Sequence, residues 1–206
     1  WSGTDYEFAP VMQIMQAACL EYLQEKAIDF SSGLIPDIEG KSYYQAKIRA
    51  AYVDGRLQAT SGGLEVENHY ARSLHRQIKM YGLDSSVVFE NIRTASPNAI
   101  LNNWRTIISD HQNKQWFPEL TENDMASLLE ALGRENLVAL ARSLFENPDD
   151  NANGWPDIWA IKDGRLTLFE VKSGDTLRDT QIRAFSELIP KYGFAARVVR
   201  IKKFNI

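Results

Sequence analysis

Two carboxylates and an ammonium group lie close together in the last quarter of the sequence, where they could act on a phosphodiester. Asp157 follows a Gly-Trp-Pro tripeptide, and Glu170 and Lys172 come thirteen and fifteen residues later. A hard cation such as Mg²⁺ prefers carboxylate and carbonyl oxygens and bridges them to substrate phosphate. Such a metal lowers the pKa of a bound water, and a nearby lysine can orient that water or neutralise developing charge. These residue types therefore favour metal-dependent hydrolysis without a covalent nucleophile.

A predicted β-hairpin brings the three residues together. Asp163-Gly164, flanked by apolar residues, is a strong signal for a two-residue hairpin turn. Residues 158–161 form the predicted rising strand, and residues 166–172 form the returning one. Strand side chains alternate with period two, so the acid and the lysine that end the returning strand share a face. Since Asp157 precedes the rising strand, we expect all three groups to converge at one end of the hairpin.

Each part of this pattern also has an ordinary structural interpretation. A Pro-Asp dipeptide is more often a turn, and Glu-x-Lys on a strand is usually a solvated face. The combination favours a site, because a charged pair ends an apolar run where a core strand would continue with Val or Ile.

The same residues resemble the VRR-NUC branch of the PD-(D/E)XK nuclease superfamily, and they are most like the nuclease domain of the Fanconi-associated nucleases. The likeness is carried by Gly-x-Pro-Asp at 154–157, Glu-Val-Lys at 170–172, and then by Asp175, Leu177 and Gln181. The family motif has Gly-Pro after Glu-Val-Lys, whereas this chain has Ser-Gly and one residue fewer, which puts the shape of that loop in question. The resemblance is strong over about residues 132–193 and weakens towards the N-terminus.

The resemblance implies a catalytic centre for Mg²⁺ or Mn²⁺. Asp157, Glu170 and the Val171 carbonyl would bind the cation. Lys172 would position the attacking water, and Gln181 would support the site or contact phosphate. The alternative for Gln181 is an ordinary solvent-facing helix residue.

The resemblance also implies an upstream metal-binding glutamate on a helix. Our choice is Glu90, because the related nucleases carry a similar Glu-Asn or Glu-Gly step after a His-Tyr-containing helix and before an apolar helix containing Trp. Glu67 and Glu135 are the rival candidates. An ordinary helix-capping role for Glu90 also stays open.

Three further residues are candidates for contact with DNA. Arg178 and Arg183 lie near the start of a helix expected over residues 178–192, where backbone N–H groups favour anions. Trp155 could stack on a base, or it could pack in the core. A last strand is expected over residues 195–201, with basic residues on one face.

Composition sets limits on the class of protein. The chain has 206 residues, 44% of them hydrophobic, which is enough for one domain with a substantial core. Its one cysteine, Cys19, excludes a disulfide framework and a Cys-rich zinc site. No apolar run approaches the ~20 residues of a transmembrane helix. No signal peptide is visible, and because the chain starts at Trp1 we expect a C-terminal domain excised from a larger protein.

The net charge of −4 hides a division between two regions. Residues 157–206 carry ten Lys and Arg against six Asp and Glu, whereas residues 1–156 carry thirteen against twenty-one. Phosphate affinity depends on local charge. The basic region is the one that carries the motif, so DNA stays the expected partner.

The sequence predicts an α/β or α+β fold, with a small mixed sheet of about four strands and a large helical portion. We expect a helical N-terminal portion over residues 1–85 and a VRR-NUC-type core with inserted helices over residues 86–206. A loop is expected over 146–154 and a short strand over 87–89. Helices are expected over 12–26, 43–57, 64–81 (ended by Gly82), 98–111 (opened by Ser96-Pro97), 125–132 (after a capping box at 121–124) and 136–145.

Three functions follow as hypotheses. The first is a metal-dependent DNA endonuclease or exonuclease that acts in a cytoplasm or nucleoid, with no membrane and no nucleotide cofactor. Its use could be that of an interbacterial toxin, delivered by a type VI secretion system and neutralised by an immunity protein. The second hypothesis is that the nuclease is instead a structure-specific enzyme that cleaves junctions and flaps, in DNA repair or in a phage. The third hypothesis is an inactive binding module on the nuclease fold, which the incomplete match after Lys172 supports.

Overall fold

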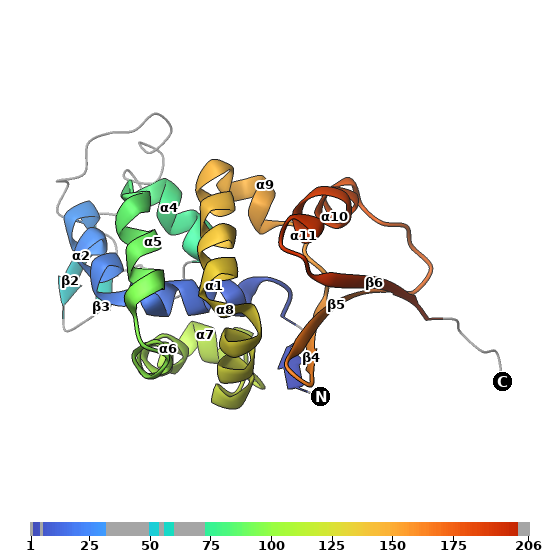
Figure 1. Ribbon diagram of the computed structural model, residues 1–206. Coiled ribbons are helices and arrows are strands. Elements are labelled where there is room, and N and C mark those ends of the chain that lie inside the picture. Colours follow the sequence, from blue (N-terminus) through green and yellow to red (C-terminus); the bar gives the residue numbers. More distant parts are fainter. Residues whose placement is uncertain (1, 5, 32–49, 54–55, 60–72, 202–206) are drawn as a thin grey trace.

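A four-stranded mixed sheet packs beside a larger group of helices (Figure 1). The computed structural model describes residues 2–4, 6–31, 50–53, 56–59 and 73–201. The mixed α/β class and the sheet of about four strands are therefore confirmed. No helix in the described part of the chain is long and apolar enough to cross a membrane.

The strand order of the sheet is β1-β4-β5-β6. The predicted hairpin is present as β4 (Ile158–Lys162) and β5 (Arg165–Lys172), which pair antiparallel. β1 (Ser2–Thr4) pairs antiparallel with β4, and β6 (Ala195–Arg200) pairs parallel with β5. The sheet thus takes strands from both sides of the boundary expected at residue 85. That boundary itself stays a prediction.

A helical crossover joins β5 to β6, as parallel pairing requires. It consists of α10 (Asp179–Arg183), one π-helical turn (Ala184–Leu188) and α11 (Ile189–Lys191). The helix expected over 178–192 is confirmed, with a π turn in its middle.

The remaining helices form the group to the left in Figure 1. They are α1 (Ala9–Ala18), α2 (Leu20–Ser31), α4 (Leu74–Tyr81), α5 (Ser85–Thr94), α6 (Pro97–Ser109), α7 (His111–Trp116), α8 (Glu122–Glu146) and α9 (Pro148–Ala152).

The predicted helix boundaries hold where the sequence carries cap residues. Gly82 ends α4 in the left-handed conformation, with φ of 59°. Ser96 caps α6 by accepting from the Ala99 N–H, and Thr121 forms a capping box with Asp124 at the start of α8. The two helices expected over 125–132 and 136–145 are one element with non-helical backbone at Gly133.

The structure confirms helix over residues 12–26 except at Cys19 and contradicts three other expectations about secondary structure. The helix expected over 12–26 is divided at Cys19, whose buried thiol contacts the Val88 carbonyl oxygen. The strand expected over 87–89 lies inside α5, where helix capping by Asp84 outweighs a short β-branched run. The loop expected over 146–154 contains α9, capped by Asn147. The described part of the helix expected over 43–57 contains a hairpin instead, β2 (Ala50–Val53) with β3 (Arg56–Ala59). The rest of that helix, and most of the one expected over 64–81, lie outside the described residues.

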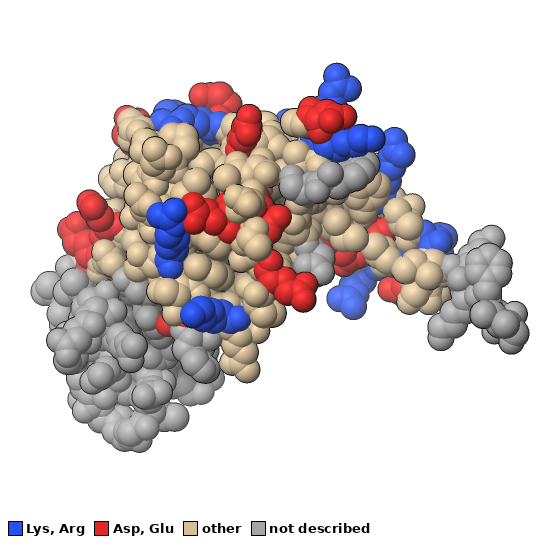
Figure 2. Space-filling model, turned by 90° about the horizontal axis from the view of Figure 1, so that it is seen from below, with Lys and Arg blue, Asp and Glu red and all other residues tan. Residues whose placement is uncertain are grey.

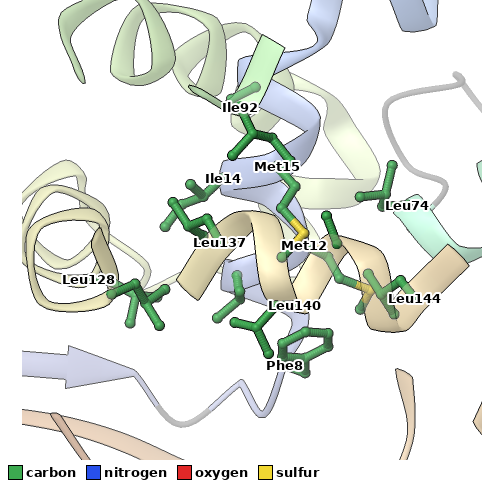
Figure 3. Packing of buried hydrophobic residues seen from close by; sticks show 14 of the residues in the cluster. Phe8, Met12, Ile14, Met15, Leu74, Ile92, Leu128, Leu137, Leu140 and Leu144 are labelled. Atoms are coloured by element: carbon green, nitrogen blue, oxygen red, sulfur yellow. The ribbon is translucent and has the colours of Figure 1, made fainter. Parts of the chain in front are cut away.

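Helix α1 is the centre of the helical core (Figure 3). Met12, Ile14 and Met15 on this helix are buried among side chains of α4, α5 and α8. Phe8, just before α1, stacks on Trp155 with ring centroids 4.5 Å apart and an interplanar angle of 10°. The aromatic stack fixes the start of α1 against the chain segment that enters β4.

Candidate active site

The turn and the strand register place Asp157 opposite Glu170. Asp163 and Gly164 both have positive φ, 53° and 72°, as the type I′ turn of a two-residue hairpin requires. Ile158 pairs with Phe169, so the residue before Ile158 lies across from the residue after Phe169. Directly opposed residues of an antiparallel pair project from the same face. Asp157, Glu170 and Lys172 therefore lie at one end of the hairpin, as expected from the sequence.

Asp157 is fixed by the backbone of β5. Its Oδ2 accepts a hydrogen bond from the Val171 N–H at 2.7 Å. The next carbonyl along β5, that of Lys172, accepts from the Ile201 N–H and so faces β6. Carbonyls alternate in direction along a strand. The Val171 carbonyl therefore faces the Asp157 side, where a shared ligand could reach both.

Glu170 and Lys172 form a buried ion pair. The Lys172 Nζ lies 2.9 Å from the Glu170 Oε1, and both side chains are no more than 5% exposed. They share a face because they are two residues apart on β5, and from Leu166 to Lys172 this strand alternates between buried and half-buried positions. Burying a charged pair is expensive and does not by itself stabilise a fold more than apolar residues would.

Gln181 on α10 connects the two members of this pair. Its Nε2 donates to the Glu170 Oε1 at 2.5 Å, and its Oε1 accepts from the Lys172 Nζ at 3.0 Å and from the Arg178 N–H at 3.0 Å. Gln181 is therefore not an ordinary solvent-facing helix residue. It orients the carboxylate and the ammonium group together.

Lys172 has a third partner in Asp175, at 3.3 Å from Nζ. The Glu170 hydrogen bond is the main cause that raises the pKa of Lys172 above its ordinary value. Hydrogen bonds from its own backbone N–H and from Lys172 lower the pKa of the exposed Asp175 carboxyl. Lys172 is therefore held as a cation.

The glycine of the Gly-Trp-Pro-Asp segment allows α10 to approach. Gly154 has a φ of 81°, and a Cβ there would lie 2.3 Å from the Thr180 carbonyl oxygen. Only glycine fits such a contact without moving the backbone. Close packing of residue 154 against the start of α10 is what brings Gln181 over the ion pair.

Two of the residues predicted to contact DNA, Trp155 and Arg183, make contacts within the protein. Trp155 is 2% exposed, stacks on Phe8 and donates its Nε1–H to the Asn151 carbonyl oxygen, so it packs in the core and does not offer a face to a base. Arg183 donates from Nη2 to the Asn151 Oδ1 at 2.5 Å and pairs with Glu187 at 3.5 Å. The burial of Trp155 corrects the expectation that it stacks on a base, whereas contact of the half-buried Arg183 with DNA stays a prediction. Arg178, in contrast, is exposed at the start of α10.

Glu7 is the acidic residue that the sequence reasoning missed. It precedes α1, and its backbone N–H donates to the Asp157 carbonyl oxygen at 3.4 Å. Partial loss of hydration raises the pKa of Glu7, the charges of Asp157 and Glu170 raise it further, and Arg178 lowers it. Its φ of 50° is unusual for a residue other than glycine. Such backbone outliers cluster at functional sites.

Glu90, the expected third ligand, is not brought to this cluster. It lies on α5, 3.8 Å from Arg93, and lines a separate depression with residues of α5 and Arg142. In Figure 1, α5 is on the far side of α8 from the sheet. Of the rivals, Glu135 lies on α8, and Glu67 lies outside the described residues.

The described residues hold no ready-made group of three His, Cys, Asp or Glu side chains for a metal ion. Two observations nevertheless fit a hard cation. The buried Glu170 Oε2 has no hydrogen-bond partner among the described protein atoms. The charges of Asp157 and Glu170 also act together on Glu7. Mg²⁺ usually keeps several waters and takes only one or two protein carboxylates. The oxygen-rich donor set fits that kind of site.

Lys and Arg side chains lie along the right-hand side of Figure 2, the side on which Figure 1 has β6, α10 and α11, with acidic side chains between them. No protein-family model matches this chain, and a search of curated proteins gives no match. Function is therefore inferred from the geometry and chemistry of the site itself.

A sequence signal for Glu7 is weak but present. Glu7 stands just before α1, which begins at Ala9 and has Pro10 in its first turn, and the resemblance implies a glutamate carried on a helix. What places this glutamate is the pairing of Thr4 with Trp159. A three-residue strand has too short a pattern to be read from the sequence.

Proposed function

We propose that this chain is a metal-dependent DNA nuclease of the PD-(D/E)XK type that hydrolyses phosphodiester bonds. One observation carries the proposal: Glu170 and Lys172 are buried 2.9 Å apart, bridged by Gln181, at the end of the hairpin where Asp157 lies. A fold gains little from this ion pair, whereas a phosphodiesterase needs its charges held in one geometry.

Four groups would hold the metal: the carboxylates of Glu7, Asp157 and Glu170 and the Val171 carbonyl. When bound, Mg²⁺ or Mn²⁺ supplies Lewis-acid stabilisation of the phosphate and a more acidic water. Glu7 replaces Glu90 in this proposal, because Glu7 adjoins Asp157 and Glu90 does not.

Lys172 supplies the positive charge next to the scissile phosphate. Its contact with Asp175 is the longest of its three and involves a 60% exposed carboxylate, so this partner is the one that a phosphate oxygen or the attacking water would replace. Gln181 and Glu170 keep the ammonium group in place during that exchange. The expected products are a 5′-phosphate and a 3′-hydroxyl.

Arg178 would contact the DNA backbone. It is exposed, its guanidinium lowers the pKa of Glu7, and its backbone N–H is bonded to Gln181, so it lies next to the same site. A contact of this kind positions DNA without reading its sequence.

The same chemistry suits two uses, a toxin delivered into a target bacterium or a repair or phage enzyme. Growth arrest on cytoplasmic expression, relieved by a neighbouring small gene that encodes an immunity protein, favours the toxin. Preference for flaps or junctions over linear duplex favours repair.

Incubating the purified chain with supercoiled plasmid tests the class. The proposal expects nicking or linearisation with Mg²⁺ or Mn²⁺, and none with EDTA. Intact plasmid at every metal concentration, from a chain shown to be folded by circular dichroism, would leave the inactive binding module as the better description.

A further inference from the structure

The described helices that contact the sheet pack mainly on one of its faces, and the other face approaches them at its edge, where Lys162 lines a depression with Ser127 and Glu130 of α8. On β5, Leu166, Leu168, Glu170 and Lys172 are buried, and the residues between them are only half-buried. Side chains of a strand alternate between the two faces of the sheet. The half-buried residues therefore mark a second face, called the outer face here, and the active site lies on the inner one.

The helices that contact the sheet lie on the inner side. Trp159, on the inner face, contacts Phe8 before α1 and Phe194 after α11. Gln181 on α10 reaches Glu170, which is also on the inner face. In Figure 1, the helices all lie to the left of the sheet or above it.

The outer face extends across the strands and has an apolar centre. Strand register places Ile158 opposite Phe169 and, in the parallel pair, Val171 next to Val199. Ile201 continues the same face beyond β6. Val199 is 42% exposed and Ile201 is 56% exposed. Adjoining apolar side chains left open in this way are typical of an interaction surface.

The charges on the outer face are of one sign. Alternation places Lys162, Arg165 and Arg197 on this face, and all three are exposed. The strand residues that the structure describes on this face include no Asp or Glu. The expectation that the basic residues of β6 share one face is thereby corrected, because Arg197 is on the outer face and Arg200 is on the inner one with Lys172.

We propose that the outer face docks a segment of a partner protein that carries an apolar stripe flanked by carboxylates, in the form of an amphipathic acidic helix. A helix laid on a sheet is the usual way to cover an apolar sheet face. Its apolar stripe would cover Phe169, Val171 and Val199, and its carboxylates would meet Arg165 and Arg197.

The same observations disfavour two other occupants. A second copy stacked face to face would bring Arg197 and Arg165 against cations of the other sheet, and like charges oppose association. DNA would pair with the cations but would leave the apolar centre without apolar contact. The inference does not depend on the nuclease proposal, because the active site is on the other face.

The test uses two dye-labelled synthetic peptides with the same Leu stripe at helical spacing, one flanked by Glu and the other by Lys. Fluorescence anisotropy measures their binding to the full chain. The Glu peptide is expected to bind about tenfold more tightly than the Lys peptide. Arg197→Glu and Val199→Asp should each weaken binding of the Glu peptide by about tenfold.

Arg200→Glu is the matched control, since it makes the same charge change on the same strand but on the opposite face. It should leave peptide binding unchanged, and Arg197→Glu should leave plasmid cleavage unchanged. Equal binding of the two peptides, or equal loss with Arg197→Glu and Arg200→Glu, would overturn the proposal. So would concentration-dependent dimerisation in sedimentation that Val199→Asp abolishes, or double-stranded DNA binding that Arg197→Glu abolishes.

Discussion

The backbone N–H of Glu7 donates to the carbonyl oxygen of Asp157, across 150 residues of chain. This contact brings an acidic side chain from the start of α1 to the end of the β4–β5 hairpin. It also explains why the pKa of Glu7 is raised, since partial loss of hydration and the carboxylates of Asp157 and Glu170 all disfavour its ionised form.

Replacing Glu7 with Gln should increase the stability of the metal-free protein at neutral pH. A carboxyl whose pKa is raised on folding binds protons more tightly in the native state, so its contribution to stability falls as pH rises from the ordinary Glu value through the raised one. Because solvent screens this side chain, we expect the melting temperature of E7Q to exceed that of the wild type by only about 1–2 °C at pH 7.5 in EDTA. The difference should disappear near pH 4. A lower melting temperature for E7Q at pH 7.5 would contradict this explanation.

The same substitution should weaken metal binding. The wild type is expected to gain thermal stability as Mn²⁺ is added, because an ion that binds only the native state stabilises it. E7Q should gain clearly less, and E90Q should behave as the wild type, because Glu90 pairs with Arg93 away from the site. Equal Mn²⁺ stabilisation of E7Q and the wild type would show that Glu7 is not a metal ligand.

The ion pair between Lys172 and Glu170 should contribute stability that is present at neutral pH and is lost at alkaline pH. The pKa of Lys172 is raised from an ordinary value of 10.5, chiefly by the Glu170 hydrogen bond. A cation with a raised pKa contributes stability that is full below its ordinary pKa and is lost as pH rises through the raised value. K172M should therefore be several degrees less stable than the wild type at pH 7, and the K172M/E170Q double variant should recover part of that loss. Neither should cleave DNA. Additive losses in the double variant would show that the two side chains do not interact.

Gly154 offers a test of how α10 is positioned. G154A should lower the cleavage rate and the stability together, because its Cβ would meet the Thr180 carbonyl oxygen at 2.3 Å and move Gln181 from Glu170. G193A is the matched control: Gly193 also has positive φ, 69°, but no atom lies within 4 Å of its added Cβ. We expect G193A to lose about 1 kcal/mol of stability from backbone strain and to keep its cleavage rate. Similar rates for the two variants would contradict this positioning role.

The two arginines near α10 should have different roles. R178A should weaken DNA binding and reduce the salt dependence of the binding constant by about one unit of slope, as loss of one phosphate contact does. R183A should leave that slope unchanged and lower the melting temperature, because Arg183 is bonded to the buried Asn151. Binding isotherms at several salt concentrations, with thermal melts of the same samples, separate these outcomes.

The sequence predicts the hairpin half of the site well. Asp163-Gly164 specifies the turn, the turn specifies the register, and the register places Asp157 opposite Glu170. Gln181 is also predictable, since its spacing from Asp175 and Leu177 matches the resemblance, although the loop after Lys172 is one residue shorter. These relations are local, so short patterns carry them.

The rest of the site depends on contacts between distant segments. Glu7 reaches Asp157 only because Thr4 pairs with Trp159 and Phe8 stacks on Trp155. Trp155 and Arg183 look like ligands in the sequence, but both are bonded to Asn151 on α9. No periodicity within one element reveals such contacts, because they form only when the helical group and the sheet pack together.

The most direct test of the central claim compares the cleavage rates of E170Q and E90Q on supercoiled plasmid with Mg²⁺ or Mn²⁺. Both remove one carboxylate charge, one from the buried cluster and one from the exposed surface of α5. The proposed nuclease site predicts that E170Q loses cleavage by at least about a hundredfold while E90Q retains the wild-type rate. Undiminished cleavage by folded E170Q, or an equal loss in E90Q, would contradict the assignment of this cluster as the catalytic centre.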